Sequence, residues 1–175
     1  MSISFFKRVF GFDDNDAARI GEFGMLFDTL SREFSKLNDT EIKKITGFSG
    51  LIGKVSYADM DISADEKRKM HAIFVTELRV DDEQAALLVS ILVEHRIQLF
   101  SIEDYFYSRL INEVCSDEDK MRLMRAMFSV AAADGAISQE EDAAIYTAAK
   151  SLHLTHRDFI SVRKSFVDYL DVLKK

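Results

Sequence analysis

Two short turns of this sequence contain the side chains best suited to bind a cation, because both turns are rich in carboxylates. Carboxylate oxygens are the ligands that hard cations such as Ca²⁺ and Mg²⁺ prefer. If the fold brings the two turns together, four or more of these carboxylates could share one ion. The candidate ligands are Asp59, Asp61 and Glu66 in the first turn, and Asp134, Glu140 and Glu141 in the second.

The second turn, which reads VAAADGAISQEED, looks like the end of a calcium-binding EF-hand loop. A complete loop needs oxygen ligands at its positions 1, 3 and 5. With Asp134 at position 5, positions 1 and 3 fall on Val130 and Ala132, whose side chains carry no oxygen. An EF-hand is therefore excluded. Cation binding of another kind stays open, beside a structural alternative in which Gly135 ends one helix and a serine cap begins the next.

Apolar residues recur at every third or fourth position, which is the spacing of one face of an α-helix. The chain has no proline and only seven glycines, a composition that favours long helices over turn-rich β structure. We therefore expect an all-α fold, a compact helical bundle of about eight helices with no strand. The apolar stripes run from Phe23 to Leu37, Ile42 to Val55, Met70 to Leu78, Leu88 to Leu99, Phe106 to Val114, Met121 to Ala131, Ile145 to Leu152 and Phe159 to Leu173. His95 lies within the fourth stripe, so we expect a hydrogen-bonded core histidine there.

Four of the expected helices begin with the pattern of a capping box. In this motif a side-chain oxygen accepts a hydrogen bond from a backbone amide, and an acid three residues later reaches back to the cap. The four pairs are Ser63 and Glu66, Ser116 and Asp119, Ser138 and Glu141, and Thr155 and Asp158. The links between helices are only a few residues long, which predicts that neighbouring helices pack antiparallel.

The sequence also repeats itself. VSYADMDISADE at 55–66 aligns with VAAADGAISQEE at 130–141 at an offset of 75 residues, with six identities in twelve. Further on, 78–81 aligns with 152–155 at an offset of 74. We interpret this as two pseudo-symmetric three-helix repeats at about 41–100 and 117–173, with the helices at 20–37 and 102–115 outside them. A chance similarity of alanine-rich helix ends is the alternative.

Composition and motifs exclude several classes of function. The formal charge of −7 argues against nucleic-acid binding, which needs a basic face. One cysteine and no secretory signal fit a cytoplasmic protein. The sequence has no glycine-rich phosphate loop, no Ser–His or Cys–His set and no three-ligand zinc spacing, so we expect no enzymatic activity.

The first residues, ISFFKRVFGF, form a separate candidate for contact with a membrane or a partner. Ile3, Phe6 and Phe10 share one helical face, and basic side chains flank it. Packing on the domain or dimerisation is the alternative. A polar joint follows at 13–16, so we expect residues 1–19 to form an amphipathic segment with its joint and residues 20–175 to form a single helical domain.

The paired Ala-Asp-(Gly)-x-Ile-Ser-x-x-Glu turns resemble those of the tellurite-resistance protein B (TerB) family. Two further stretches of this chain, FYSRLINE at 106–113 and LTHRDFI at 154–160, resemble the same family. The resemblance covers about residues 41–170, and implies an all-α TerB-type domain of tellurite-resistance and stress-response systems. Related domains occur in membrane-anchored DnaJ-like co-chaperones. The chain departs from the pattern at Met60, where the second turn has Gly135, and in its Phe-rich first forty residues.

What the resemblance implies for function is a non-catalytic bacterial stress-response module. Its acidic turns would bind a divalent cation, Ca²⁺ or Mg²⁺, a protein partner such as a membrane protein, or both. We expect the protein to be cytoplasmic, either free or peripheral to the inner membrane. The alternative is a protein-interaction scaffold or homodimerising helical domain that binds no metal.

Overall fold

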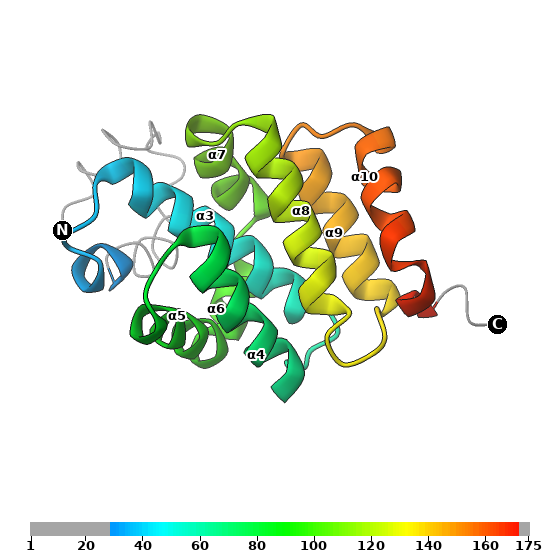
Figure 1. Ribbon diagram of the computed structural model, residues 1–175, viewed down its shortest axis with the longest axis horizontal. Coiled ribbons are helices and arrows are strands. Elements are labelled where there is room, and N and C mark those ends of the chain that lie inside the picture. The colour runs from blue at the N-terminus through cyan, green and yellow to red at the C-terminus, as the bar shows by residue number, and fades with distance from the viewer. Residues whose placement is uncertain (1–28, 172–175) are drawn as a thin grey trace.

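The computed structural model describes residues 29–171, and the fold of these residues is all-α, as predicted from the sequence. Eight α-helices lie wholly within this range, residues 29–33 are helical as well, and the described residues form no strand (Figure 1). The helices are α3 (Asp39–Ser56), α4 (Ala64–Ile73), α5 (Asp82–Glu94), α6 (Arg96–Ser101), α7 (Asp104–Val114), α8 (Asp117–Ala131), α9 (Gln139–Ser151) and α10 (His156–Arg163). A π-helix (Phe74–Leu78) follows α4, and a 3₁₀-helix (Lys164–Tyr169) follows α10. The candidate contact residues Ile3, Phe6 and Phe10 lie outside the described residues.

Capping boxes begin six of these helices. All four predicted boxes are confirmed, at α4, α8, α9 and α10. Two more, Asn38 with Glu41 and Asp81 with Gln84, begin α3 and α5. Each box satisfies backbone groups that the first turn of a helix leaves without partners. The boundaries of the bundle are therefore set largely by local side chains.

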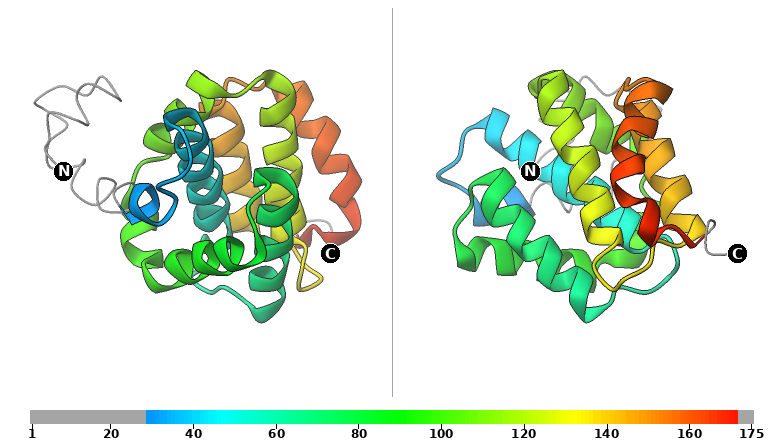
Figure 2. Two further views of the ribbon diagram at one scale, coloured as in Figure 1. Left: turned by 60° about the vertical axis from the view of Figure 1, so that its left-hand side comes forward. Right: turned by 45° about the vertical axis from the view of Figure 1, so that its right-hand side comes forward.

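Helix α3 runs through the middle of the molecule, and α8, α9 and α10 lie in a row beside it (Figures 1 and 2). Thirteen of its eighteen residues are buried, among them the polar Thr46, Ser49 and Ser56. Its closest neighbour is α7, whose Tyr107 is fully buried. A Cβ atom added at Gly50 would lie 2.2 Å from the Tyr107 ring, so a glycine is required for this approach.

The fourth predicted helix is interrupted at His95. Helix α5 ends at Glu94, and α6 begins at Arg96 in a new direction, because His95 leaves helical geometry with φ −104° and ψ 17°. The side chain of His95 is exposed, so its prediction as a core residue is wrong. The apolar spacing continues across the break because Leu92 and Leu99 both face the core from their separate helices.

The last predicted helix also ends early. Helix α10 stops at Arg163, and the chain tightens into the 3₁₀-helix, within which Phe166 has a non-helical φ of −119°. Beyond it the backbone pairs with the second acidic turn: the Ile137 amide donates to Tyr169 O at 2.7 Å, and the Asp171 amide donates to Ile137 O at 3.1 Å. The C-terminal segment is thereby attached to the junction between α8 and α9.

Positive φ angles occur at matching places in the two halves. Met60 has a φ of 75° and Gly135, 75 residues later, a φ of 103°. Arg79 has a φ of 57° and His153, 74 residues later, a φ of 62°. The aligned turns therefore share a backbone conformation, although Met60 carries a side chain where Gly135 has none. The duplication itself stays a prediction.

We expect Met60→Gly to raise the free energy of unfolding by about 0.5–1 kcal/mol. A left-handed backbone strains a residue with a Cβ atom, and the Met60 side chain is 68% exposed, so its removal sacrifices little packing. Urea denaturation followed by circular dichroism measures the change. Met60→Ala is the matched control, since it removes the side chain and keeps the strain. An equal gain in both variants would contradict the explanation.

Candidate functional site

The two acidic turns form neighbouring junctions at one end of the bundle. We call residues 57–63, between α3 and α4, the first junction, and residues 132–138, between α8 and α9, the second junction. Their loops lie side by side in each of the views (Figures 1 and 2). The aspartates make the same local bond in both: Asp59 Oδ1 accepts from the Asp61 amide at 3.2 Å, and Asp134 Oδ1 accepts from the Ala136 amide at 3.2 Å.

A glutamate enters the protein interior immediately after each junction. Ser63 Oγ accepts from the Glu66 amide at 3.1 Å, and the Ser63 amide donates to Glu66 Oε2 at 2.8 Å. Ser138 and Glu141 make the same pair of bonds at 3.1 and 2.9 Å. Most cap acids are solvated, but Glu66 is only 5% exposed and Glu141 only 4%. The capping boxes therefore carry two carboxylates into the core.

One carboxylate oxygen of these two buried glutamates has no hydrogen-bond partner among the described residues. Glu66 Oε1 is buried and accepts no hydrogen bond, while Oε2 of the same carboxylate is used by the cap. A buried polar atom without a partner is rare in native proteins, and it points to a missing proton, water or ion. This atom is the observation that separates the junctions from an ordinary pair of helix starts.

The electrostatics of the two glutamates show that the junctions act on each other. Burial raises the pKa of Glu66 to about 7; the Ser63 hydrogen bonds oppose this, and the charges of Asp134 and Asp59 add to it. Burial raises the pKa of Glu141 to about 8, again opposed by Ser138, with Glu66 and Asp59 adding to it. The pKa of each glutamate is thus raised by the charge of a carboxylate from the other half of this site.

Four of the six predicted ligands are brought into this electrostatic group, namely Asp59, Glu66, Asp134 and Glu141. The other two differ. Asp61 accepts a hydrogen bond from the neighbouring Ile62 amide, and Glu140 is exposed in the first turn of α9. Within residues 29–171, no three His, Cys, Asp or Glu side chains stand in an arrangement that would enclose a metal ion as they are.

The burial of the two glutamates was missed from the sequence, although a signal for it exists. Glu66 precedes Met70 by four residues, and Glu141 precedes Ile145 by four. Residues four apart share a helix face, and both Met70 and Ile145 are fully buried. Each acid therefore lies at the start of the apolar stripe of its helix, which a solvated cap acid would not require.

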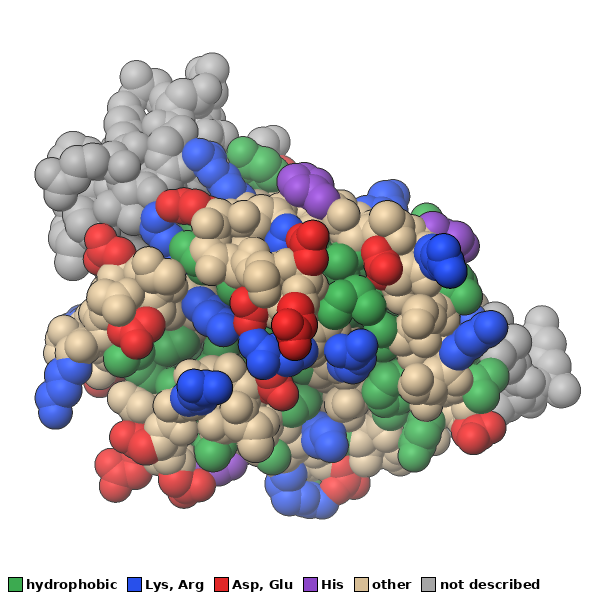
Figure 3. Space-filling view, turned by 45° about the horizontal axis from the view of Figure 1, so that its top comes forward, with side chains coloured by type: hydrophobic (Ala, Val, Ile, Leu, Met, Phe, Trp, Pro, Cys, Tyr) green, Lys and Arg blue, Asp and Glu red, His purple; other side chains and the backbone are tan. Residues whose placement is uncertain are grey.

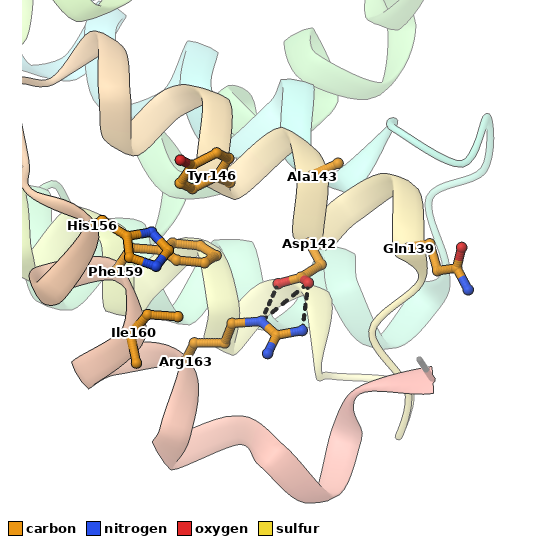
Figure 4. Close-up of a pocket in the computed structure, with 8 residues that line it drawn as sticks. All are labelled: Gln139, Asp142, Ala143, Tyr146, His156, Phe159, Ile160 and Arg163. Carbon is orange, nitrogen blue, oxygen red and sulfur yellow. Dashed lines mark hydrogen bonds and ion pairs between the residues drawn. The ribbon is translucent and has the colours of Figure 1, made fainter. Parts of the chain in front are cut away.

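A hollow of about 370 Å³ lies between α9 and α10 (Figure 4). Its wall is aromatic, with the rings of Tyr146 and Phe159 5.0 Å apart. At its other end Arg163 binds both carboxylate oxygens of Asp142, with Nε 2.9 Å from Oδ1 and Nη2 2.7 Å from Oδ2. The ion pair between Arg163 and Asp142 links α10 to α9. Because these two charges neutralise each other, the hollow has less capacity to bind a charged ligand than the junctions have.

No helix among the described residues is long and apolar enough to cross a membrane. No curated protein and no solved structure matches the chain. The model of one family, described as "Tellurite resistance protein TerB", matches residues 47–164. That range includes α7, both junctions and both buried glutamates, and it spans more than half of the chain. The chain belongs to the TerB family of tellurite-resistance proteins.

Proposed function

We propose that this protein is a non-catalytic module of the tellurite-resistance type that binds a divalent cation at its paired junctions. Glu66 and Glu141 would hold the ion between them. The observation that carries the proposal is the buried, unpartnered Oε1 of Glu66, beside a second buried carboxylate from the other half of the chain. Membership of the TerB family supports the type of module.

The donor set fits a hard cation. Mg²⁺ is commonly held by only one or two carboxylates, with water completing its coordination, and Ca²⁺ accepts more oxygen ligands. Two buried carboxylates cannot both ionise easily without a counter-charge, and a divalent ion would supply it. Asp59 and Asp134, which already act on the glutamates electrostatically, would add negative charge near the ion.

The alternative is a scaffold that binds a protein partner or a second copy and takes up no metal. In that case the two glutamates would stay neutral and serve as caps. Glutamine performs the same capping bond at the start of α5, where the Asp81 amide donates to Gln84 Oε1 at 3.1 Å. Glutamine variants of the two glutamates can therefore remove the charge and keep the caps.

Calorimetric titration of Ca²⁺ and Mg²⁺ into the chelator-treated full chain tests the proposal. We expect binding with a dissociation constant below about 1 mM, and at least a tenfold loss of affinity in Glu66→Gln and in Glu141→Gln. Glu140→Gln is the matched control, because Glu140 is an exposed acid of the same helix turn. Absence of binding below millimolar concentrations, or equal affinity in all three variants, would favour the scaffold.

A further inference from the structure

A cavity of about 480 Å³ lies away from the junctions, at the opposite end of α4. It is enclosed by the start of α3, the π-helix after α4, the first turn of α5, and α8. Its volume falls within the range of small-molecule sites, roughly 300–1,000 Å³. Part of its wall is aliphatic, formed by Leu37, Ile45, Leu78 and Val80.

Three basic side chains from three separate elements line this cavity: Lys44 of α3, Arg122 of α8, and Arg79. Asp119 binds two of them, with Lys44 Nζ 3.3 Å from its Oδ1 and Arg122 on the same oxygen. Burial alone would raise the pKa of Asp119, but hydrogen bonds from Ser116 and Arg122 hold it well below its usual range. Asp119 therefore stays charged and holds two cations at the cavity.

These two cations keep hydrogen-bond donors to spare. A lysine ammonium has three N–H groups and a guanidinium has five, and one carboxylate oxygen uses few of them. Two acids also line the cavity. Glu41 Oε2 accepts from the Asn38 amide at 2.9 Å, whereas Glu77 lies 3.8 Å from Arg122 and pairs loosely with this cavity cation. On the face shown in Figure 3, basic and acidic side chains interleave, with hydrophobic side chains exposed between them.

Arg79 is the third cation, and its backbone is strained. It follows the π-helix in a left-handed conformation, with φ 57° and ψ 32°. A left-handed conformation is uncommon for a residue with a Cβ atom, π-helices are rare in any sequence, and both features concentrate at functional sites. Arg79 is exposed, and its guanidinium makes no hydrogen bond or ion pair with the part of the chain that the structure describes. Glycine would end the helix in this conformation without strain. The presence of arginine at this position therefore suggests that its side chain has a role.

We propose that this cavity binds a small phosphate monoester, with the phosphate on Arg79, Lys44 and Arg122 and an apolar body against the aliphatic wall. A phosphate monoester carries close to two negative charges at neutral pH and three acceptor oxygens. It therefore attracts three cations more strongly than the single charges of Glu41 and Glu77 do, and guanidinium groups bind phosphate through paired N–H donors. This site is independent of the cation proposed at the junctions.

Titration of phenyl phosphate into the full chain in the presence of chelator, followed by calorimetry, tests the proposal. We expect binding of phenyl phosphate, at least tenfold weaker binding of inorganic phosphate, which has no apolar body, and no binding of phenol, which has no charge. Arg79→Gly should weaken phenyl phosphate binding at least tenfold. It should also raise the unfolding temperature, because glycine relieves the left-handed strain, so loss of binding cannot be ascribed to unfolding.

His153→Gly is the matched control. His153 occupies the aligned position in the other half of the chain, with φ 62°, and its side chain is exposed and does not line the cavity. It should raise the unfolding temperature in the same direction and leave phenyl phosphate binding unchanged. The proposal is overturned if phenyl phosphate does not bind at millimolar concentration, or if Arg79→Gly and His153→Gly bind it as well as the wild type does.

Discussion

In the presence of chelator, the free energy of unfolding should fall by several kcal/mol as the pH rises from 5 to 8.5. Below about pH 4.5, Glu66 and Glu141 are protonated in both the folded and the unfolded chain. Above it the unfolded chain releases these protons, whereas the folded chain holds them until the pH passes about 7 for Glu66 and about 8 for Glu141. The folded state thus binds more protons in this window, and its stability declines with rising pH. Each unit of pKa shift corresponds to about 1.4 kcal/mol.

Urea denaturation at a series of pH values measures this profile, and the double variant Glu66→Gln, Glu141→Gln is its control. The variant should show a nearly flat profile and exceed the wild type in stability at pH 8.5, because the amides preserve both caps without a charge to bury. Asp119 and Asp158, whose pKa values are lowered, lose their contribution only at more acidic pH and leave this window unaffected. If the wild type and the double variant lost stability equally as the pH rises, Glu66 and Glu141 would not be the source of the pH dependence.

Gly50→Ala should destabilise the fold by about 1–3 kcal/mol or more, through overpacking between α3 and α7. The new Cβ atom would lie 2.2 Å from two carbons of the Tyr107 ring. Tyr107 is fully buried, and its hydroxyl donates a bond of 3.5 Å to Leu99 O, so the ring has no free space to move into. Either the helices separate or the tyrosine leaves its site, and both cost core packing. Chemical denaturation gives the loss directly.

Gly53→Ala is the matched control for this prediction, one helical turn further along α3. The closest approach of its Cβ atom would be to a terminal methyl of Leu92, at 2.9 Å, and a methyl group at the end of a side chain can rotate away. We expect a much smaller loss of stability, partly offset by the better helix propensity of alanine. If Gly50→Ala were no more damaging than Gly53→Ala, the close approach of α3 and α7 would not be what fixes their packing.

The fold class and four of the six capped helix starts could be predicted from the sequence because the signals are local. A Ser63 and Glu66 pair, or an apolar residue every third or fourth position, acts within one turn and needs no knowledge of the rest of the chain. The boxes at Asn38 and Asp81 follow the same physics with a carbonyl or carboxylate oxygen in place of a hydroxyl. Both were missed because all four predicted caps carry a hydroxyl group.

What the sequence did not predict depends on contacts between distant segments. The stripe through Leu92 and Leu99 looks continuous, but its two parts pack on the core from different directions, so the break at His95 is set by tertiary packing. The burial of Glu66 is likewise not local, because its helix α4 packs against α8, which begins only at Asp117. A capping pattern identifies the acid; only the neighbouring helices decide whether water reaches it.

The π-helix at Phe74–Leu78 has a consequence for the history of the chain. Twelve residues separate Glu66 from Leu78, but eleven separate Glu141 from Leu152. A π-turn closes its hydrogen bond over one residue more than an α-turn does, and it lies within the longer interval. On the predicted duplication, the π-helix would absorb an amino acid inserted into one copy, which would otherwise rotate every later side chain of the helix by about 100°. Under that prediction, a single-codon insertion would change the backbone only at the π-helix and leave the side chains after it facing the core.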